Sequence, residues 1–243
     1  MFIEETILSV LNQTYQNIEY IIVDGKSTDN TMEIVEKYRD RINIIISEKD
    51  GGQSNAINKG FKLATGQLVG WLNSDDLISP DCVEIVVERF KRGSNIALVQ
   101  PQLANFIDEK SHVTCQRKIQ ANTLNEILHT NYAIIQPGSF YRRDLVEKIG
   151  WINESLHYCM DLDLILRLLQ FGNIASVETA ISSFRIWENS KTSTGNVKFL
   201  DEIKQTILKH GGTVFSRNII VKYYVYKYKF YVKQALLSIG IEI

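Results

Sequence analysis

From residue 67 to residue 76 the chain reads QLVGWLNSDD, a short apolar run that ends in two adjacent carboxylates. The apolar part, residues 67–72, has the length and composition of a strand buried on both faces. Because open α/β sheets bind ligands at the carboxyl ends of their strands, a site is expected at Asp75 and Asp76. Solvent, helix capping or a divalent cation such as Mg²⁺ or Mn²⁺ relieves the repulsion between two such neighbours. An ordinary polar turn before Pro80 is the alternative interpretation.

The segments on either side of this run alternate between short apolar stretches and helical periodicity. Three more strands are predicted, at 18–23, 42–46 and 96–99. Helices are predicted at 3–12, 31–38, 54–63 and 80–90, and shorter ones at 124–129, 144–149 and 161–169. This alternation is typical of an α/β fold, and we expect a single wound, mostly parallel sheet flanked by helices.

Composition and charge exclude several classes of protein. The 27 basic and 28 acidic residues leave a formal net charge of −1, which supplies no general field for binding a nucleic-acid backbone. The three cysteines lie far apart without a CxxC spacing, which favours a reducing compartment over a disulfide framework. No basic, apolar signal sequence and no uncharged stretch of about 20 residues is visible. We therefore expect a cytoplasmic globular protein that binds no nucleic acid.

Three further segments carry side chains suited to a site. Asp24 ends a predicted strand, and because Ser27 and its neighbours can serve the turn, Asp24 is left to accept hydrogen bonds from a ligand. Residues 50–60 read DGGQSNAINKG, a glycine pair before a helix that matches neither the dinucleotide fingerprint nor the P-loop. Asp161 and Asp163 point in different directions on a helix, and capping by Asp161 is as good an explanation as catalysis.

The sequence resembles the family 2 glycosyltransferases, especially bacterial members that build polysaccharide or lipopolysaccharide. The resemblance lies in the order of four features: Asp24, the DGGQSNAINKG turn, the WLNSDD strand end and the helix MDLDLILRL. The resemblance covers residues 3–190 and includes QPGSFYRR at 136–143. It implies a nucleotide-diphospho-sugar transferase fold of the GT-A type, with a catalytic domain over residues 1–200. It also implies inverting transfer of a sugar, by default from a UDP-sugar, to a hydroxyl of a saccharide or lipid-linked saccharide acceptor.

The resemblance also implies roles for individual residues. Asp161 matches the carboxylate that takes the proton of the attacking hydroxyl. Asp75 and Asp76 match the position that holds a divalent cation, Mg²⁺ or Mn²⁺, on the donor diphosphate, and the sequence leaves open which of them touches the metal. The residues expected to bind the nucleotide-sugar donor are Asp24, Ser27, Asp50, Gln53, Asn58, Asn73 and Asp75.

Three departures from the family pattern lead to alternatives. Family members usually open with an apolar strand inside the sheet, so we expect either that the protein starts upstream of Met1 or that it is a destabilised relative that binds its donor weakly. Met160 stands where many members have Glu, and Trp187 where related enzymes often have a His near the metal. The alternatives are a catalytically impaired nucleotide-sugar-binding relative and a sugar nucleotidyltransferase.

The C-terminal part, residues 201–243, is predicted to be a separate helical tail. Between Arg217 and Lys233 it has five basic residues, five tyrosines and no acidic residue. A basic, aromatic helix suits a bilayer surface, so we expect peripheral contact of residues 217–239 with the inner face of the cytoplasmic membrane. A helix that packs its tyrosines on the core, with lysines reaching solvent, is the alternative.

Overall fold

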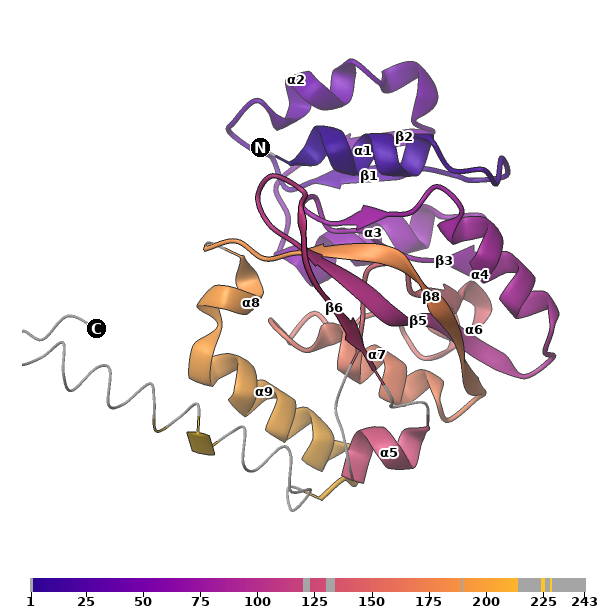
Figure 1. The fold of residues 1–243 in the computed structure, drawn as a ribbon, viewed down its shortest axis with the longest axis vertical. Helices are drawn as coiled ribbons and strands as arrows, with labels where there is room; N and C mark the ends of the chain where they lie inside the picture. Colours follow the sequence, from indigo (N-terminus) through magenta and orange to yellow (C-terminus); the bar gives the residue numbers. More distant parts are fainter. Residues whose placement is uncertain are drawn as a thin grey trace, which may run out of the picture.

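The computed structural model describes residues 2–119, 123–129, 134–188 and 190–213, together with Tyr224, Val225 and Tyr228 (Figure 1). The other residues of the predicted basic, aromatic segment 217–239 lie outside this range. Among the described helices, none is both long and apolar enough to span a bilayer.

The helices and strands follow one another along the chain as α1 (Ile3–Leu11), β1 (Ile21–Asp24), α2 (Thr31–Glu36), the 3-10 helix η1 (Arg39–Arg41), β2 (Ile44–Ser47), α3 (Gln53–Leu63), β3 (Leu68–Val69), β4 (Leu77–Ile78), α4 (Cys82–Lys91), β5 (Ile96–Ile107), β6 (Val113–Lys118), α5 (Leu124–His129), β7 (Phe140–Arg142), α6 (Arg143–Lys148), α7 (Met160–Leu168), β8 (Asn173–Arg185), α8 (Lys191–Thr194) and α9 (Asn196–Lys209). The predicted helices are present within three residues of their expected ends. The α/β class is therefore confirmed.

The strands form two sheets, whereas the sequence analysis expected one mostly parallel sheet. β1 and β2 pair in parallel, with Ile21 opposite Ile44. The larger sheet has the order β3-β7-β5-β8-β4, and β6 pairs with β5. Within the described part of that sheet, only β5 and β8 run parallel. The prediction missed β6 because all of its residues are exposed, so it has no apolar run. It missed β7 and β8 because partly buried strands carry polar residues on one face, which hides them among the loops of 104–190.

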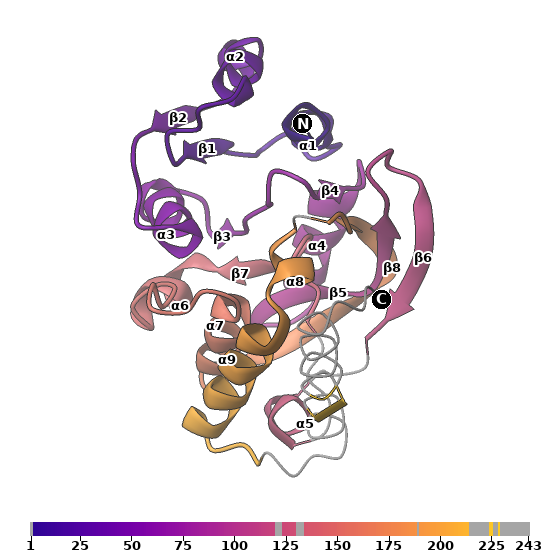
Figure 2. The ribbon, with the colours of Figure 1, turned by 90° about the vertical axis from the view of Figure 1, so that its left-hand side faces the viewer.

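A cavity of about 1870 Å³ separates the two sheets. Its walls include residues 18–23 around β1, residues 68–73 around β3, and apolar side chains of α3 and α4. Residues of both β1 and β3 line the cavity, and Figure 2 shows β1 above β3, with β2 on the side of β1 away from β3.

The largest group of buried apolar side chains surrounds α7. Leu162, Leu164, Ile165, Leu166 and Leu168 of this helix are fully buried, and they share one core with Ile203 and Ile207 of α9. α9 therefore belongs to the same packed body as α7, although it crosses the domain boundary expected at residue 200. This packing fixes the direction in which the first turn of α7 faces the cavity.

Candidate active site

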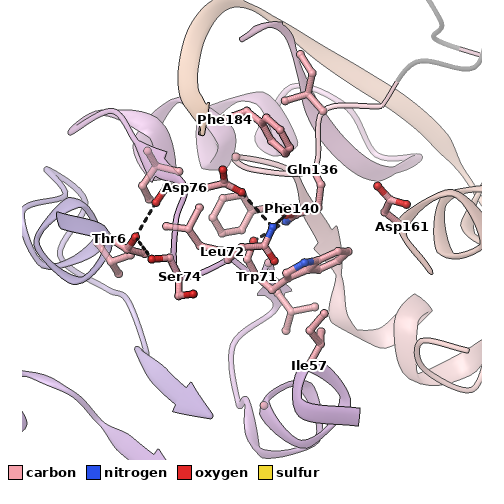
Figure 3. Close-up of a pocket in the computed structure, with 18 of the residues that line it drawn as sticks. Thr6, Ile57, Trp71, Leu72, Ser74, Asp76, Gln136, Phe140, Asp161 and Phe184 are labelled. Carbon is pink, nitrogen blue, oxygen red and sulfur yellow. Dashed lines mark hydrogen bonds between the residues drawn. The ribbon is translucent and has the colours of Figure 1, made fainter. Parts of the chain in front are cut away.

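Three carboxylates from two distant parts of the chain line the cavity. Asp75 and Asp76 follow β3, and Asp161 lies in the first turn of α7. Figure 3 shows Asp76 and Asp161 at this cavity together with Trp71 and Gln136. The structure thus places the predicted metal-binding pair and the predicted base at one site.

Asp76 is the buried member of the pair, with 1% of its surface exposed. Its Oδ1 accepts a hydrogen bond of 3.0 Å from the backbone N–H of Arg185, and its Oδ2 accepts one of 3.0 Å from Nδ2 of Asn73. Burial and the neighbouring charge of Asp75 raise the pKa of Asp76 to about 7. Both oxygens of Asp76 are therefore engaged in holding the turn.

Arg185, at the end of β8, lies fully buried beneath the same turn. Its Nε donates to the carbonyl oxygen of Asp75 at 2.8 Å, and its Nη1 donates to the carbonyl oxygen of Asp108 at 2.8 Å. Its Nη2 pairs with Oε2 of Glu5 at 3.0 Å, and the guanidinium stacks over the ring of Phe2. The sequence analysis did not identify Arg185, because an arginine inside an unrecognised strand gives no local signal.

Asp75 presents the more available carboxylate of the pair. Its Oδ2 accepts a hydrogen bond of 2.9 Å from Nε1 of Trp187. In the part of the chain that the structure describes, no three His, Cys, Asp or Glu side chains are grouped so that they could hold a metal. Asp75 fits a cation that is held largely by ligand oxygens, because Mg²⁺ is commonly bound by one or two carboxylates together with substrate phosphates.

A chain of amide hydrogen bonds runs along the cavity wall. Nζ of Lys191 donates to Oε1 of Gln53, and Nε2 of Gln53 donates to Oδ1 of Asn73, both at 2.8 Å. Nδ2 of Asn73 donates to Oδ2 of Asp76 and to Oε1 of Gln136. Gln53 and Asn73, both predicted to bind the donor, are thus linked to each other and to a half-buried lysine that the sequence analysis did not identify.

The surroundings of Asp161 raise the pKa of its carboxyl group. Its Oδ1 accepts the backbone N–H of Leu162 at 2.8 Å. Burial raises the pKa of Asp161 to about 6, against the effect of that hydrogen bond and of the nearby Lys191 ammonium, while the Glu202 charge raises it further. A carboxylate that titrates near neutral pH is suited to accept and release protons.

Asp24, Ser27 and Asp50 lie outside the set of residues that line the large cavity. The sequence analysis left Asp24 without a structural task, which is wrong: it accepts the backbone N–H groups of Lys26 and Ser27 and the hydroxyl of Ser47. Although burial opposes it, these hydrogen bonds lower the pKa of Asp24. Asp50 accepts the backbone N–H of Gly52 at 2.8 Å, so these acids organise two turns of the chain.

Asn58 is likewise engaged within the protein. Its Nδ2 donates to the carbonyl oxygen of Ile152 and to Oε1 of Glu154, and its Oδ1 accepts the backbone N–H of Ile152. With 3% of its surface exposed, it joins α3 to the loop before α7. The structure therefore gives Asn58 a packing role, and the donor contact expected from the sequence stays a prediction.

Comparison of the sequence with known families and proteins gives consistent matches. The model of the family described as glycosyl transferase family 2 matches residues 2–150. An uncharacterized glycosyltransferase of Rickettsia typhi is 29% identical over 204 residues, which are 79% of this chain and 62% of that protein. The chondroitin synthase of Escherichia coli is 28% identical over 229 residues, 91% of this chain and 32% of the synthase. The chain thus spans less than two thirds of the length of these relatives.

Solved structures with the same fold are also found. S. aureus TarS, residues 1–349 in complex with UDP-GlcNAc, matches with a TM-score of 0.69 at 18% identity. The match covers 100% of this chain and 73% of the TarS chain. A mannosyltransferase from Pyrobaculum calidifontis, in complex with GDP-Man and Mn²⁺, matches with a TM-score of 0.67 at 14% identity. The match covers 93% of this chain and 65% of the mannosyltransferase chain. At these identities the likeness shows the fold alone, and both structures support a GT-A type architecture.

Proposed function

The chain belongs to glycosyl transferase family 2, and on that premise we propose that it transfers a sugar from a nucleoside-diphosphate donor to a saccharide hydroxyl, with inversion at the anomeric carbon. The observation that carries the proposal is the placement of Asp161 and Asp75 on one cavity. The general base and the diphosphate of the donor can lie in the same cavity, because Asp161 and Asp75 come from different elements that both line it.

Asp161 is the proposed general base. A sugar hydroxyl is a weak nucleophile, so a carboxylate must take its proton as the oxygen attacks the anomeric carbon. The bond between that carbon and the diphosphate oxygen breaks in the same displacement. Because attack comes from the face opposite the leaving group and no protein nucleophile intervenes, the configuration inverts.

Asp75 is the proposed metal ligand. It is favoured over Asp76, whose two carboxylate oxygens are occupied by Arg185 and Asn73. A divalent cation bound there would neutralise negative charge on the leaving diphosphate. The complex of the Pyrobaculum mannosyltransferase with Mn²⁺ supports the use of a divalent cation. The ammonium of Lys191, on the Asp161 side of the site, adds positive charge to the same cavity.

The donor is proposed to be a UDP-sugar. The complexes of S. aureus TarS with UDP and UDP-GlcNAc support this choice, and GDP-Man in the mannosyltransferase supports a nucleotide-sugar more generally. The side chains of Gln53 and Asn73 are the proposed polar contacts to the donor, because both line the cavity and belong to the chain of amide hydrogen bonds along its wall. Contacts from Asp24, Ser27 and Asp50 to the donor stay a proposal drawn from the family resemblance.

The acceptor is proposed to be a saccharide of a cell-surface polysaccharide or lipopolysaccharide, free or lipid-linked. The chondroitin synthase relative supports polysaccharide synthesis. Contact of residues 217–239 with the inner face of the membrane would bring the site close to a lipid-linked acceptor.

Nucleoside-diphosphate release tests the proposal. Purified protein is incubated with UDP-GlcNAc, UDP-glucose, UDP-galactose or GDP-mannose, with Mn²⁺ or Mg²⁺, and with saccharide acceptors. Asp161→Asn should lower kcat by about 10²- to 10⁴-fold, or about 3–5 kcal/mol of transition-state stabilisation, while donor binding persists. Pyrophosphate release from a nucleoside triphosphate and a sugar phosphate would instead support a nucleotidyltransferase. Donor-induced thermal stabilisation without turnover would support a binding protein.

A further inference from the structure

The loop that leads into α7 is held by a side chain from a distant helix. Oε1 of Glu202, on α9, accepts the backbone N–H groups of Tyr158 and Cys159 at 2.6 and 2.7 Å, and its Oε2 accepts that of His157 at 3.0 Å. Cys159, the residue that caps α7, makes no side-chain hydrogen bond to the helix. Glu202 therefore satisfies three backbone donors at a helix N-terminus, where a negative charge is also favourable.

α9 is itself fixed against α7, so it presents Glu202 at a defined position. Ile203 and Ile207 are buried in the core that surrounds α7. The ring of Phe199 packs against Tyr158, with 5.7 Å between the ring centroids. Gly195 lets the backbone approach closely, since a Cβ there would lie 2.8 Å from Cε1 of Tyr158. Figure 2 shows the two helices side by side.

The other end of α9 is tied to α7 as well. Nε2 of His210, which follows α9, lies 3.0 Å from Oδ1 of Asp163, and Nε of Arg167 donates to Oδ2 of the same carboxylate at 2.7 Å. Asp163, which is fully buried, faces away from the cavity that Asp161 lines. Movement of α9 would consequently change the orientation of the first turn of α7.

We propose that Glu202 is a positioning residue for the transfer reaction: by holding the three backbone N–H groups at 157–159, its carboxylate keeps Asp161 directed into the cavity. The inference rests on the proposed function, because it treats Asp161 as the base. It gives a role to α9, which lies beyond the residues that the family model matches.

Glu202 also acts on Asp161 through its charge. The charged and titratable groups that face Asp161 are Glu202 from α9, Lys191 from α8, Tyr141 from β7 and the thiol of Cys159 before α7. The negative charge of Glu202 disfavours ionisation of Asp161, and the positive charge of Lys191 favours it. Removal of the Glu202 charge should therefore make Asp161 a stronger acid.

Two substitutions separate position from charge. Glu202→Gln removes the charge but keeps one oxygen able to accept the hydrogen bonds of Tyr158 and Cys159. Glu202→Ala removes both the charge and the three hydrogen bonds. Glu178→Gln is the matched control, because it removes one negative charge from an exposed position on β8.

The titration of Asp161 is followed by carboxyl ¹³C NMR in the absence of donor, with Asp161→Asn to assign the signal. In Glu202→Gln the pKa of Asp161 should fall, because the charge that disfavours its ionisation is gone, and in Glu178→Gln it should stay unchanged. In Glu202→Ala, kcat should fall at least about tenfold with the donor KM nearly unchanged, because the base loses its orientation while the donor contacts remain. An unchanged Asp161 titration in Glu202→Gln would contradict the charge effect, and wild-type kcat in Glu202→Ala would overturn the proposal.

The two proposals fail in distinguishable ways. If the wild-type protein transfers no sugar from any donor, the proposed function fails, while the NMR titration still reports whether Glu202 controls Asp161. If the wild-type protein is active and Glu202→Ala keeps the wild-type kcat, only the role of Glu202 fails. If Glu202→Ala does not fold, kcat of Glu202→Gln decides the question, because its single amide oxygen cannot accept all three backbone N–H groups.

Discussion

Nε1 of Trp187 donates a hydrogen bond of 2.9 Å to Oδ2 of Asp75, the carboxylate proposed to bind the metal. The indole cannot ligate a cation, because its nitrogen is a donor only. An imidazole at the same place would offer a second metal ligand beside Asp75. We therefore expect Trp187→His to lower the Mn²⁺ concentration required for half-maximal activity by about tenfold.

Metal titration of the transfer rate measures this effect, with isothermal calorimetry of Mn²⁺ alone as an activity-independent check. Trp187→Phe is the control, since it removes the hydrogen bond without adding a ligand. Equal Mn²⁺ requirements for Trp187→His and Trp187→Phe would show that position 187 does not reach the metal.

The pH dependence of the reaction should report the titration of Asp161. Burial raises the pKa of this carboxyl to about 6, and a general base acts only when it is deprotonated. kcat/KM should therefore be constant above that pH and fall about tenfold for each unit below it. A profile recorded from about pH 4 to about pH 8 at saturating metal tests this, and the residual rate of Asp161→Asn should show no such decrease at low pH. A wild-type limb near pH 4 would exclude a buried base.

The sequence predicted the helices better than it predicted the sheet. It also singled out Asp75 and Asp161, which line one cavity, because strand ends and helix starts are marked locally by a change from apolar to polar residues. The roles of Arg185 and Glu202 could not, since each acts on backbone groups more than 40 residues away along the chain. Asp24 was misjudged for a related reason: its partner Ser47 comes from the next strand.

The turn at Asp75 and Asp76 should depend on Arg185 for its stability. Arg185→Met keeps much of the side-chain volume but leaves the partly buried carbonyl oxygens of Asp75 and Asp108 without their donors. Each unsatisfied group costs about 1–3 kcal/mol, so we expect a loss of roughly 2–6 kcal/mol in the free energy of unfolding, together with loss of metal-dependent activity.

Urea unfolding measures the change, and Arg39→Met, at an exposed pair with Glu36, serves as the control with little expected effect. A shift of the same small size in both variants would mean that the Arg185 hydrogen bonds do not stabilise the turn.

The cavity between the sheets predicts uneven stability across the fold. β5 is paired on both sides, with β7 and β8, and its residues 96–101 are buried. Within the described residues, β1 pairs with β2 alone and borders the cavity on its other side. Backbone groups without ladder partners open more readily, so amides of Ile22 and Val23 should exchange with solvent at least about 100-fold faster than those of Leu98 and Val99.

Hydrogen exchange followed by NMR or mass spectrometry of the unliganded protein measures both strands in one sample, so β5 is the internal control. Addition of a nucleotide-sugar should slow exchange at α7 and at residues 73–76 if the donor binds in the cavity, whereas β5 should not change. Equal protection of β1 and β5 before any addition would contradict the prediction, because it would require the cavity-facing edge of β1 to be covered.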